Sequence, residues 1–345
     1  MVKQKDEIVS ISKAYGIMLM VLAHAGLCVQ GQHIVYMFHM PLFFFYAGYC
    51  FKEEYTKDIK RFIKRKILRL YIPFLIWSLL FLAVHNIFYR IGIYSSEYGY
   101  NNDVSYLYNC SDYISRFFFI TFLMSKFEQI VGGYWFVREL FWASIVCCSM
   151  LRFFNIVWLI TISISLTLLS SIMNYYGVVP FILQLTLLSI SFFLIGYFFK
   201  KENLFQYKTY LLAVICLVCL LICAYYYPTS MLTFSVNNVI PYIISAISGI
   251  YLIHCISSET PSLFKKYLVY IGDNSFIILT LHMLSFKVIS LIYVFHYKLE
   301  IVRISEFPTI SDIKSSFWVI AYFVVGIILP LGYVKIKNKW LYILK

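Results

Sequence analysis

Apolar segments long enough, or nearly long enough, to cross a membrane recur from one end of this 345-residue chain to the other. A transmembrane helix needs about 20 mostly apolar residues. Charged residues make up only 13% of the chain, against about 25% in soluble domains, so a soluble globular fold and a disordered chain are both excluded. The sequence predicts an all-α polytopic membrane protein with about ten transmembrane helices. The expected spans are 8–29, 34–51, 71–90, 134–151, 155–173, 178–199, 209–227, 236–254, 270–295 and 316–335.

Positive charges are distributed unevenly among the connections between these spans. The 29 Lys and Arg residues outnumber the 16 Asp and Glu residues, which gives a formal net charge of +13. In a soluble protein this excess would indicate nucleic-acid binding, but in a membrane protein cations collect on cytoplasmic loops. When the N-terminus is placed inside, every inner connection carries Lys or Arg. We therefore expect both termini in the cytoplasm, a multi-pass protein of the cytoplasmic membrane in contact with lipid, and no nucleic-acid partner.

Two connections differ from the others. Residues 52–70 are strongly basic and their apolar side chains fall near one helical face, which predicts an interfacial helix at the inner leaflet. A solvated run of charges explains the same residues, and a third interpretation is that these cations attract an anionic cytosolic substrate. Residues 91–133 form the longest outer loop. Within it, the segment from Tyr113 to Met124 is apolar but too short to span, and we expect it to lie on the outer leaflet or dip into it.

The nine cysteines predict neither a disulfide framework nor a metal site. All but Cys110 lie in or beside apolar runs, as small buried hydrophobic side chains do. The first apolar run is longer than the core of a signal peptide, so it is expected to remain as the first helix. Residues 1–345 are expected to form a single integral membrane domain with no separate soluble domain.

Few ionisable side chains lie inside the predicted spans. Each is a candidate functional residue, because a charge inside the bilayer is costly. Most of them fall in the middle or outer part of the membrane, while Lys13 lies near the inner end of the first span. This pattern predicts a polar cavity that reaches the outer face and has a cation at its inner mouth. The candidates within the spans are His24, His39, His85, Arg138, Glu139, His282 and Lys287.

Lys13 and His24 share one face of the first predicted helix. The 11 positions between them correspond to a rotation about 20° beyond three full turns of the helix, and to a distance of about 16 Å along its axis. A long ligand could contact both, with an anionic end near Lys13 and a reactive end near His24. The alternative is an ordinary inner-leaflet lysine and a structural histidine that bonds a neighbouring helix.

The other candidates also have structural alternatives. Pro41 follows His39, and a proline inside a helix frees the carbonyl four residues earlier, here that of Met37. This predicts a polar notch beside His39, or alternatively a packing kink with one satisfied histidine. Arg138 and Glu139 project about 100° apart on a helix, so they need not pair with each other and can neutralise partners on other helices.

Five segments, in order, resemble motifs of the acyltransferase-3 family of integral membrane acyltransferases, especially its polysaccharide O-acetyltransferase branch. The first consists of a basic residue, ten further residues and a histidine, and here Lys13 stands where arginine is more usual. Each segment alone is weakly specific, but the five together cover essentially the whole chain. They are KAYGIMLMVLAH at 13–24, FHMPLFFFYAGYCFK at 38–52, RLYIPFLIW at 69–77, GYWFVRELF at 133–141 and IGDNSFIILTLH at 271–282.

The resemblance implies transfer of an acetyl or larger acyl group from cytosolic acyl-CoA to a hydroxyl of a surface or secreted glycan, as in exopolysaccharide biosynthesis. The key basic residue and histidine of the family correspond to Lys13 and His24. We therefore expect Lys13, with Arg69, to hold the CoA phosphates, and His24 to act as general base or acyl carrier. The expected assisting residues, which include donors to the oxyanion, are His39, Arg138, Glu139 and His282.

Two other functions fit the same residues. A transporter or flippase for an anionic glycan intermediate would use the charged cavity without chemistry, although the internal repeats typical of transporters are not evident. A membrane sensor or scaffold would share the fold without turnover, but it would have no need of the histidines at 24 and 39. Consumption of a thioester in an acetyl-transfer assay distinguishes an enzyme from both.

Overall fold

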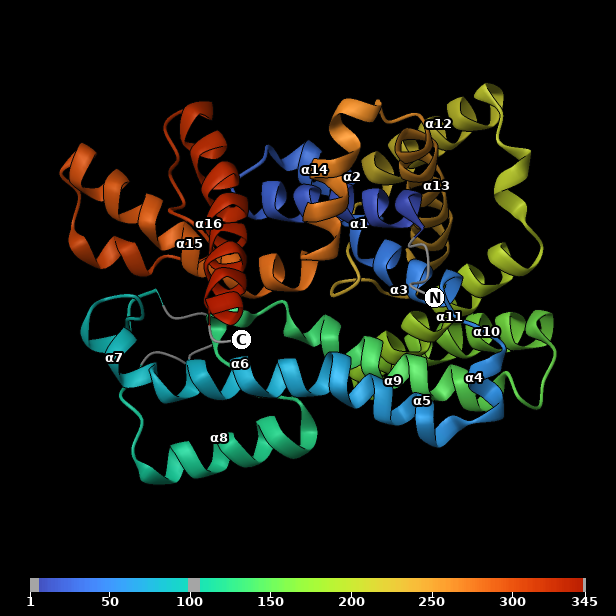
Figure 1. Cartoon of the computed structure of the whole chain (residues 1–345), viewed down its shortest axis with the longest axis horizontal. Coiled ribbons are helices and arrows are strands. Elements are labelled where there is room, and N and C mark those ends of the chain that lie inside the picture. The colour runs from blue at the N-terminus through green and yellow to red at the C-terminus, as the bar shows by residue number, and fades with distance from the viewer. Residues whose placement is uncertain (1–5, 99–105, 344–345) are drawn as a thin grey trace. The chain divides into compact units, whose positions relative to one another are not determined.

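The structure is a computed structural model that describes residues 6–98 and 106–343 (Figure 1). Every regular element in these residues is a helix, so the predicted all-α fold is confirmed. Within them, seven helices are long and apolar enough to cross a membrane, which makes the chain a multi-pass membrane protein. These seven candidate spans are Glu7–His24, Ile59–Ala83, Ile156–Tyr175, Phe181–Lys201, Val239–Ser258, Ser275–Tyr297 and Ser316–Lys339.

Three of the ten expected spans correspond to shorter helices. They are α3 (His39–Tyr49), α9 (Tyr134–Met150) and α12 (Tyr210–Tyr226), of 11, 17 and 17 residues respectively. A helix rises about 1.5 Å per residue, so α3 alone covers only about half of the roughly 30 Å hydrocarbon layer. The count of ten spans and the cytoplasmic location of both termini therefore stay predictions.

The chain divides into two compact units, and each is built from separate stretches of sequence. The first unit holds Met1–Gly16, Cys28–Tyr71 and Phe136–Gly272, and the second holds Ile17–Leu27, Ile72–Trp135 and Asp273–Lys345. Helix α1 (Glu7–His24) contributes to both units. The remaining helices are α2 (Val29–Tyr36), α4 (Glu54–Lys57), α5 (Ile59–Lys66), α6 (Ile72–Ala83), α7 (His85–Arg90), α8 (Cys110–Leu123), α10 (Ile156–Tyr175), α11 (Phe181–Lys201), α13 (Val239–Ser258), α14 (Ser262–Asp273), α15 (Ser275–Tyr297) and α16 (Ser316–Ile343).

Two glycines set the packing of α3 against α11 in the first unit. A Cβ atom on Gly48 would overlap the carbonyl oxygen of Phe193, and one on Gly196 would overlap the carbonyl oxygen of Phe45. The two backbones therefore lie in direct contact at both positions, a closeness that only small residues permit in membrane helix pairs. This reciprocal contact holds the short helix α3 in the core of its unit.

Most cysteines do not behave as the sequence predicts. Cys147 and Cys148 are fully buried in an aromatic cluster of the first unit, as expected. Cys28 and Cys50, in contrast, are exposed, because both lie just outside helix ends rather than inside apolar helices. Cys216, Cys219, Cys223 and Cys255 are partly exposed. All nine thiols are unpaired, and the described residues contain no cluster of His, Cys, Asp and Glu able to hold a metal ion.

The basic connection after α3 is helical and amphipathic, as predicted. In α5 the side chain of Phe62 is buried while those of Lys60, Arg61 and Lys64 are exposed. The Asp58 carboxylate begins the helix by accepting from the Arg61 amide at 3.0 Å, which satisfies one of the unpaired amides of its first turn. Helix α5 then continues through the π-helical segment Ile67–Tyr71 into α6, and the three together form the candidate span Ile59–Ala83, so the basic helix is the start of that span rather than a separate element.

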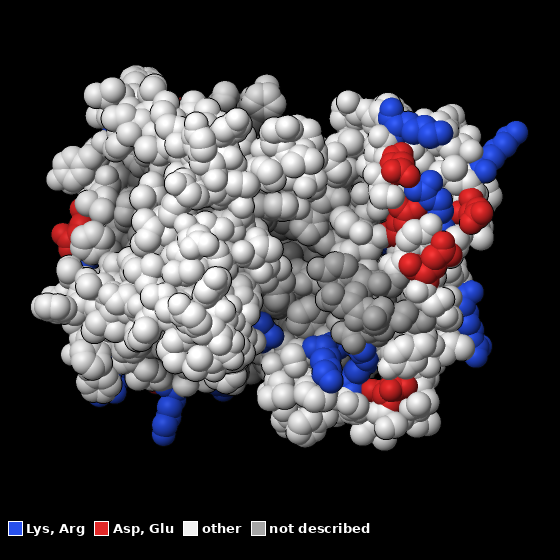
Figure 2. Space-filling model, turned by 180° about the vertical axis from the view of Figure 1, so that it is seen from behind, with Lys and Arg blue, Asp and Glu red and all other residues white. Residues whose placement is uncertain are grey.

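The apolar segment of the expected outer loop forms α8 in the second unit. At 14 residues it is about 21 Å long, which is too short to span, as predicted. A reciprocal capping box between Asn109 and Asp112 starts the helix. Arg116 and Ile120 are buried, whereas Ile114 and Phe122 are largely exposed. Exposed apolar side chains are common elsewhere too, and the face in Figure 2 is mostly uncharged, as expected of a surface in contact with lipid.

Overpacking of a core typically costs about 1–3 kcal/mol. Replacement of Gly196 by Ala is expected to destabilise the protein by more than this, because the added methyl group meets backbone that cannot move aside. The measurement is the thermal unfolding midpoint in detergent. Gly332→Ala in α16 is the matched control, since a Cβ there meets nothing within 4 Å. Equal midpoints for the two variants would contradict the close contact of α3 and α11.

Candidate active site

His24 and His282 lie together in the second unit. His24 is the last residue of α1, and His282 lies in the first half of α15. Their ring centroids are 5.5 Å apart, and the rings meet edge to face at 71°. His282 is fully buried and His24 is partly exposed. The two histidines, 258 positions apart in the sequence, thus form one polar pair.

A glycine on α16 allows this helix to pack closely against both helices that carry the histidines. A Cβ on Gly326 would lie 2.6 Å from Cε1 of Phe286 and 2.9 Å from Cγ1 of Val21. Val21 lies about one turn before His24 on α1, and Phe286 lies about one turn after His282 on α15. The Phe286 ring also meets the His282 ring at 90°, with 5.6 Å between centroids. The histidine pair is therefore positioned by the packing of α1, α15 and α16.

The hydrogen bonds of His282 determine its tautomer. Its Nδ1 lies 3.0 Å from the carbonyl oxygen of Ile278 and 2.9 Å from that of Leu279. Because carbonyl oxygens only accept, Nδ1 carries the proton. Nε2 is buried and has no hydrogen-bond partner among residues 6–98 and 106–343. In the neutral ring, Nε2 of His282 therefore presents a lone pair.

His24 also has an unsatisfied nitrogen. Its Nδ1 is buried and has no hydrogen-bond partner within the described part of the chain. Buried polar atoms are nearly always hydrogen-bonded, and exceptions call for a specific explanation such as a catalytic role. The adjacent rings of His24 and His282 therefore each carry a nitrogen without a hydrogen-bond partner in the described residues.

The start of α9 supports α15 beside the pair. Thr280 uses its one hydroxyl proton on the carbonyl oxygen of Phe276. In the 2.8 Å hydrogen bond between Tyr134 and Thr280 Oγ1, the donor is therefore the Tyr134 hydroxyl. A Cβ on Gly133 would lie 2.8 Å from Cδ1 of Leu279. The glycine and tyrosine that begin the segment GYWFVRELF therefore contact α15 just before His282.

The other sequence-predicted site residues belong to the first unit. Lys13 is partly buried on α1 and interacts electrostatically with Cys50. Arg69 is exposed and lies in the π-helical segment Ile67–Tyr71. Single π-helical turns are rare and often occur at functional sites. The sequence pattern does not predict this one. The remaining three are His39, Arg138 and Glu139.

The polar notch expected at His39 differs in the structure. The predicted span 34–51 is divided, with α2 ending at Tyr36 and α3 beginning at His39, so Pro41 lies in the first turn of α3. Proline is tolerated there because the first amides of a helix have no intrahelical partner. His39 Nδ1 donates to the Val35 carbonyl oxygen at 2.8 Å and so satisfies the end of α2. The local geometry therefore supports the structural alternative.

Arg138 and Glu139 pair with each other in the first unit. Arg138 Nε lies 2.9 Å from Glu139 Oε1, and Thr186 on α11 donates to Glu139 Oε2 at 2.7 Å. The sequence leaves open whether the two residues pair with each other or with other helices. In the structure the long arginine side chain reaches Glu139 despite the 100° between the residues, and Glu139 also has a partner on α11. Glu139 is buried with both carboxylate oxygens occupied.

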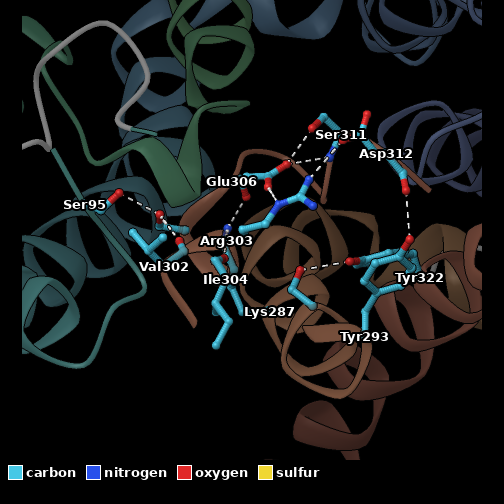
Figure 3. A network of polar contacts seen from close by, with 12 residues as sticks. Ser95, Lys287, Tyr293, Val302, Arg303, Ile304, Glu306, Ser311, Asp312 and Tyr322 are labelled. Carbon is cyan, nitrogen blue, oxygen red and sulfur yellow. Dashed lines mark hydrogen bonds and ion pairs between the residues drawn. The ribbon is translucent and has the colours of Figure 1, made fainter. Parts of the chain in front are cut away.

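Two further ionisable candidates have structural partners in the second unit. His85 Nδ1 lies 2.9 Å from Glu128 Oε2, and its Nε2 lies 3.0 Å from the Tyr106 carbonyl oxygen. Both nitrogens of His85 therefore lie against oxygen atoms, and the ring bridges Glu128 and the Tyr106 backbone. Lys287 donates to two backbone carbonyl oxygens, those of Ile304 and Glu306 (Figure 3).

A polar network around His254 in the first unit was not predicted. Hydroxyl protons run in one direction, from Tyr46 to Ser12 at 2.9 Å and from Ser12 to Ser257 at 2.9 Å. Ser257 in turn donates to the Ile253 carbonyl oxygen. Because the Tyr46 hydroxyl proton is used on Ser12, His254 Nδ1 donates to the Tyr46 oxygen at 3.1 Å. Serines inside the apolar runs of α1 and α13 were the available signal, but their pairing is not local.

The fold and the histidine pair define a multi-pass membrane protein with groups suited to proton transfer. A family model described as an acyltransferase domain matches residues 9–335, nearly the whole chain. The chain therefore belongs to the acyltransferase-3 family, as the resemblance of its motifs indicates, and the family supports a membrane acyltransferase. No curated protein and no solved structure gives a significant match.

The tautomer of His282 can be measured directly. We expect the nitrogen NMR spectrum of histidine-labelled protein in nanodiscs to show Nδ1 of His282 protonated and Nε2 unprotonated, because only Nδ1 faces carbonyl oxygens. His282→Ala assigns the signal. A spectrum with the proton on Nε2 would show that the hydrogen bonds to Ile278 and Leu279 are not formed.

Proposed function

We propose that the protein transfers an acetyl or similar acyl group from cytosolic acyl-CoA to a hydroxyl of a surface or secreted glycan. Family membership supports acyl transfer. The observation that carries the choice of site is the pair of unsatisfied nitrogens, Nδ1 of His24 and Nε2 of His282, on rings 5.5 Å apart. A hydroxyl beside them would find a proton acceptor where water is largely excluded.

In the proposed reaction, the acceptor oxygen attacks the thioester carbonyl carbon and gives its proton to His24. The carbon–sulfur bond breaks, and the proton passes from His24 to the CoA thiolate, so the enzyme returns to its starting state. In the alternative route a ring nitrogen of His24 attacks the thioester carbon and the carbon–sulfur bond breaks to release the CoA thiolate. The acceptor oxygen then attacks the acyl carbon, the bond to the ring nitrogen breaks, and the hydroxyl proton goes to the thiolate. Histidine suits both roles near neutral pH.

The tautomer of His282 favours one of its possible roles. In its neutral form Nε2 offers a lone pair rather than a proton, so it cannot donate to the oxyanion of a tetrahedral intermediate. We therefore assign His282 to orient the acceptor hydroxyl or to hold its proton together with His24. His39 and Arg138 remain proposed oxyanion donors, although His39 Nδ1 and Arg138 Nε already serve other acceptors.

Lys13 and Arg69 are proposed to hold the CoA phosphates, with Glu139 restricting the orientation of Arg138. The exposure of Arg69 and of the neighbouring cations of α5 supports an anion site at the cytoplasmic membrane surface. Lysine in place of arginine keeps the charge at position 13 but lacks the two-pronged geometry that suits phosphate. A flippase that uses the same charges without chemistry is the alternative, and family membership favours the transferase.

Replacement of His24 by Gln tests this function. We expect acyl transfer to fall at least about 100-fold, the usual size of a general acid–base contribution, while membrane insertion stays normal. The measurement is the acetyl mass difference on surface glycans, together with thiol release from acetyl-CoA in isolated membranes.

His296→Gln is the matched control. His296 lies on the same helix as His282, but it is exposed, and its ring lies near those of Tyr297 and Trp318. Its activity is expected to equal that of the wild type. Full activity of the His24 variant would remove His24 from the reaction, and a wild-type protein that releases no thiol with any glycan would favour the flippase.

A further inference from the structure

The segment 301–315 between α15 and α16, which we call the strap, is buried over parts of residues 304–310 although most of it is not helical. It begins with the 3₁₀-helix Ile301–Ser305, and Glu306 and Ile310 are 4% and 1% exposed. Backbone groups of a buried loop need partners, since an unpaired buried carbonyl is costly. The origin of those partners therefore determines how the strap is held.

Lys287 holds the first half of the strap. Its side chain leaves α15 and is only 6% exposed, and its ammonium group donates to the carbonyl oxygens of Ile304 and Glu306 (Figure 3). The Glu306 carboxylate binds Arg303 and accepts from the amide and hydroxyl of Ser311 at 2.6 and 2.7 Å. Lys287 thus fixes a loop that is also closed on itself.

Tyr293 holds the second half of the strap from the same helix. Its hydroxyl donates to the Asp312 carbonyl oxygen at 2.8 Å and accepts from the Lys314 amide at 3.2 Å. Both anchors belong to α15, the helix that carries His282. Ile313 lies between the two residues that Tyr293 contacts, so its position follows from this anchoring.

Ile313 contacts the turn that ends α1. Gly26 has a φ of +98°, which favours glycine, and a Cβ there would lie 2.8 Å from Cδ1 of Ile313. Gly26 follows His24 by two residues. The strap therefore contacts the turn that follows α1, and this turn determines where the side chain of His24, the last residue of α1, points.

We propose that Lys287 is a positioning residue for His24, acting through the strap, Ile313 and the Gly26 turn. This inference rests on the proposed function for its catalytic consequence, but its structural part does not. The strap links α15 to the end of α1, so it sets the position of the His24 ring relative to the His282 ring. A displacement of about 1 Å of a catalytic group can cost about 100-fold in rate.

The test uses Lys287→Met, which removes the donors but keeps the length of the side chain. Histidine NMR of the full chain in nanodiscs reports the His24 signal, assigned with His24→Gln, and the His254 signal of the first unit is the internal reference. We expect Lys287→Met to shift or broaden the His24 signal and to leave His254 unchanged. Lys287→Gln, which restores donors, is expected to recover part of the His24 signal.

Lys298→Met is the matched control, since Lys298 is exposed at the end of the same helix, and its His24 signal is expected to match the wild type. In acetyl-CoA turnover, Lys287→Met is expected to lower kcat about tenfold or more and to leave the KM for acetyl-CoA within about twofold. Tyr293→Phe, which loosens only the second anchor, is expected to give a smaller change of the same kind.

An unchanged His24 signal in folded Lys287→Met would overturn the positioning role. If that variant does not fold, an unchanged His24 signal in Tyr293→Phe overturns it instead. The NMR result does not depend on turnover, so a wild-type protein without transferase activity would defeat the proposed function while the link between Lys287 and His24 could still be confirmed or refuted.

Discussion

The cost of leaving a polar group unpaired inside a membrane governs most of this structure. Where the described chain buries a charge or a hydroxyl, it generally supplies a partner. Glu139 is held by Arg138 and Thr186, and Lys287 by two carbonyl oxygens. Against this background the unsatisfied nitrogens of His24 and His282 are informative, because they lie side by side on the two helices that the packing of Gly326 brings together.

The class of fold could be read from the sequence, since runs of about 20 apolar residues have one common explanation. His24 and His282 could be picked out because ionisable residues are rare in those runs. Their proximity could not, because it depends on Gly326 of a third helix and on the packing of Phe286 against it. The role of Lys287 was equally hidden, since its partners are backbone carbonyls of a loop that no side-chain pattern identifies.

Local reasoning failed where a boundary or a side-chain length mattered. The sequence predicts Pro41 inside a helix, whereas α3 begins two residues before it and accommodates it in the first turn. For Arg138 and Glu139 the directions of the Cβ atoms leave the pairing open, and the length of the arginine side chain decides it. The network of His254 was missed because its members come from helices far apart in the sequence.

The pairing of Arg138 with Glu139 also bears on how the protein is made. Helix α9 is synthesised before α11, so the Arg138–Glu139 pair is complete within one helix before Thr186 exists. Because the two residues are neighbours in the chain, neither charge has to wait for a later helix to find its counter-ion. The hydroxyl of Thr186 completes the site when α11 has formed.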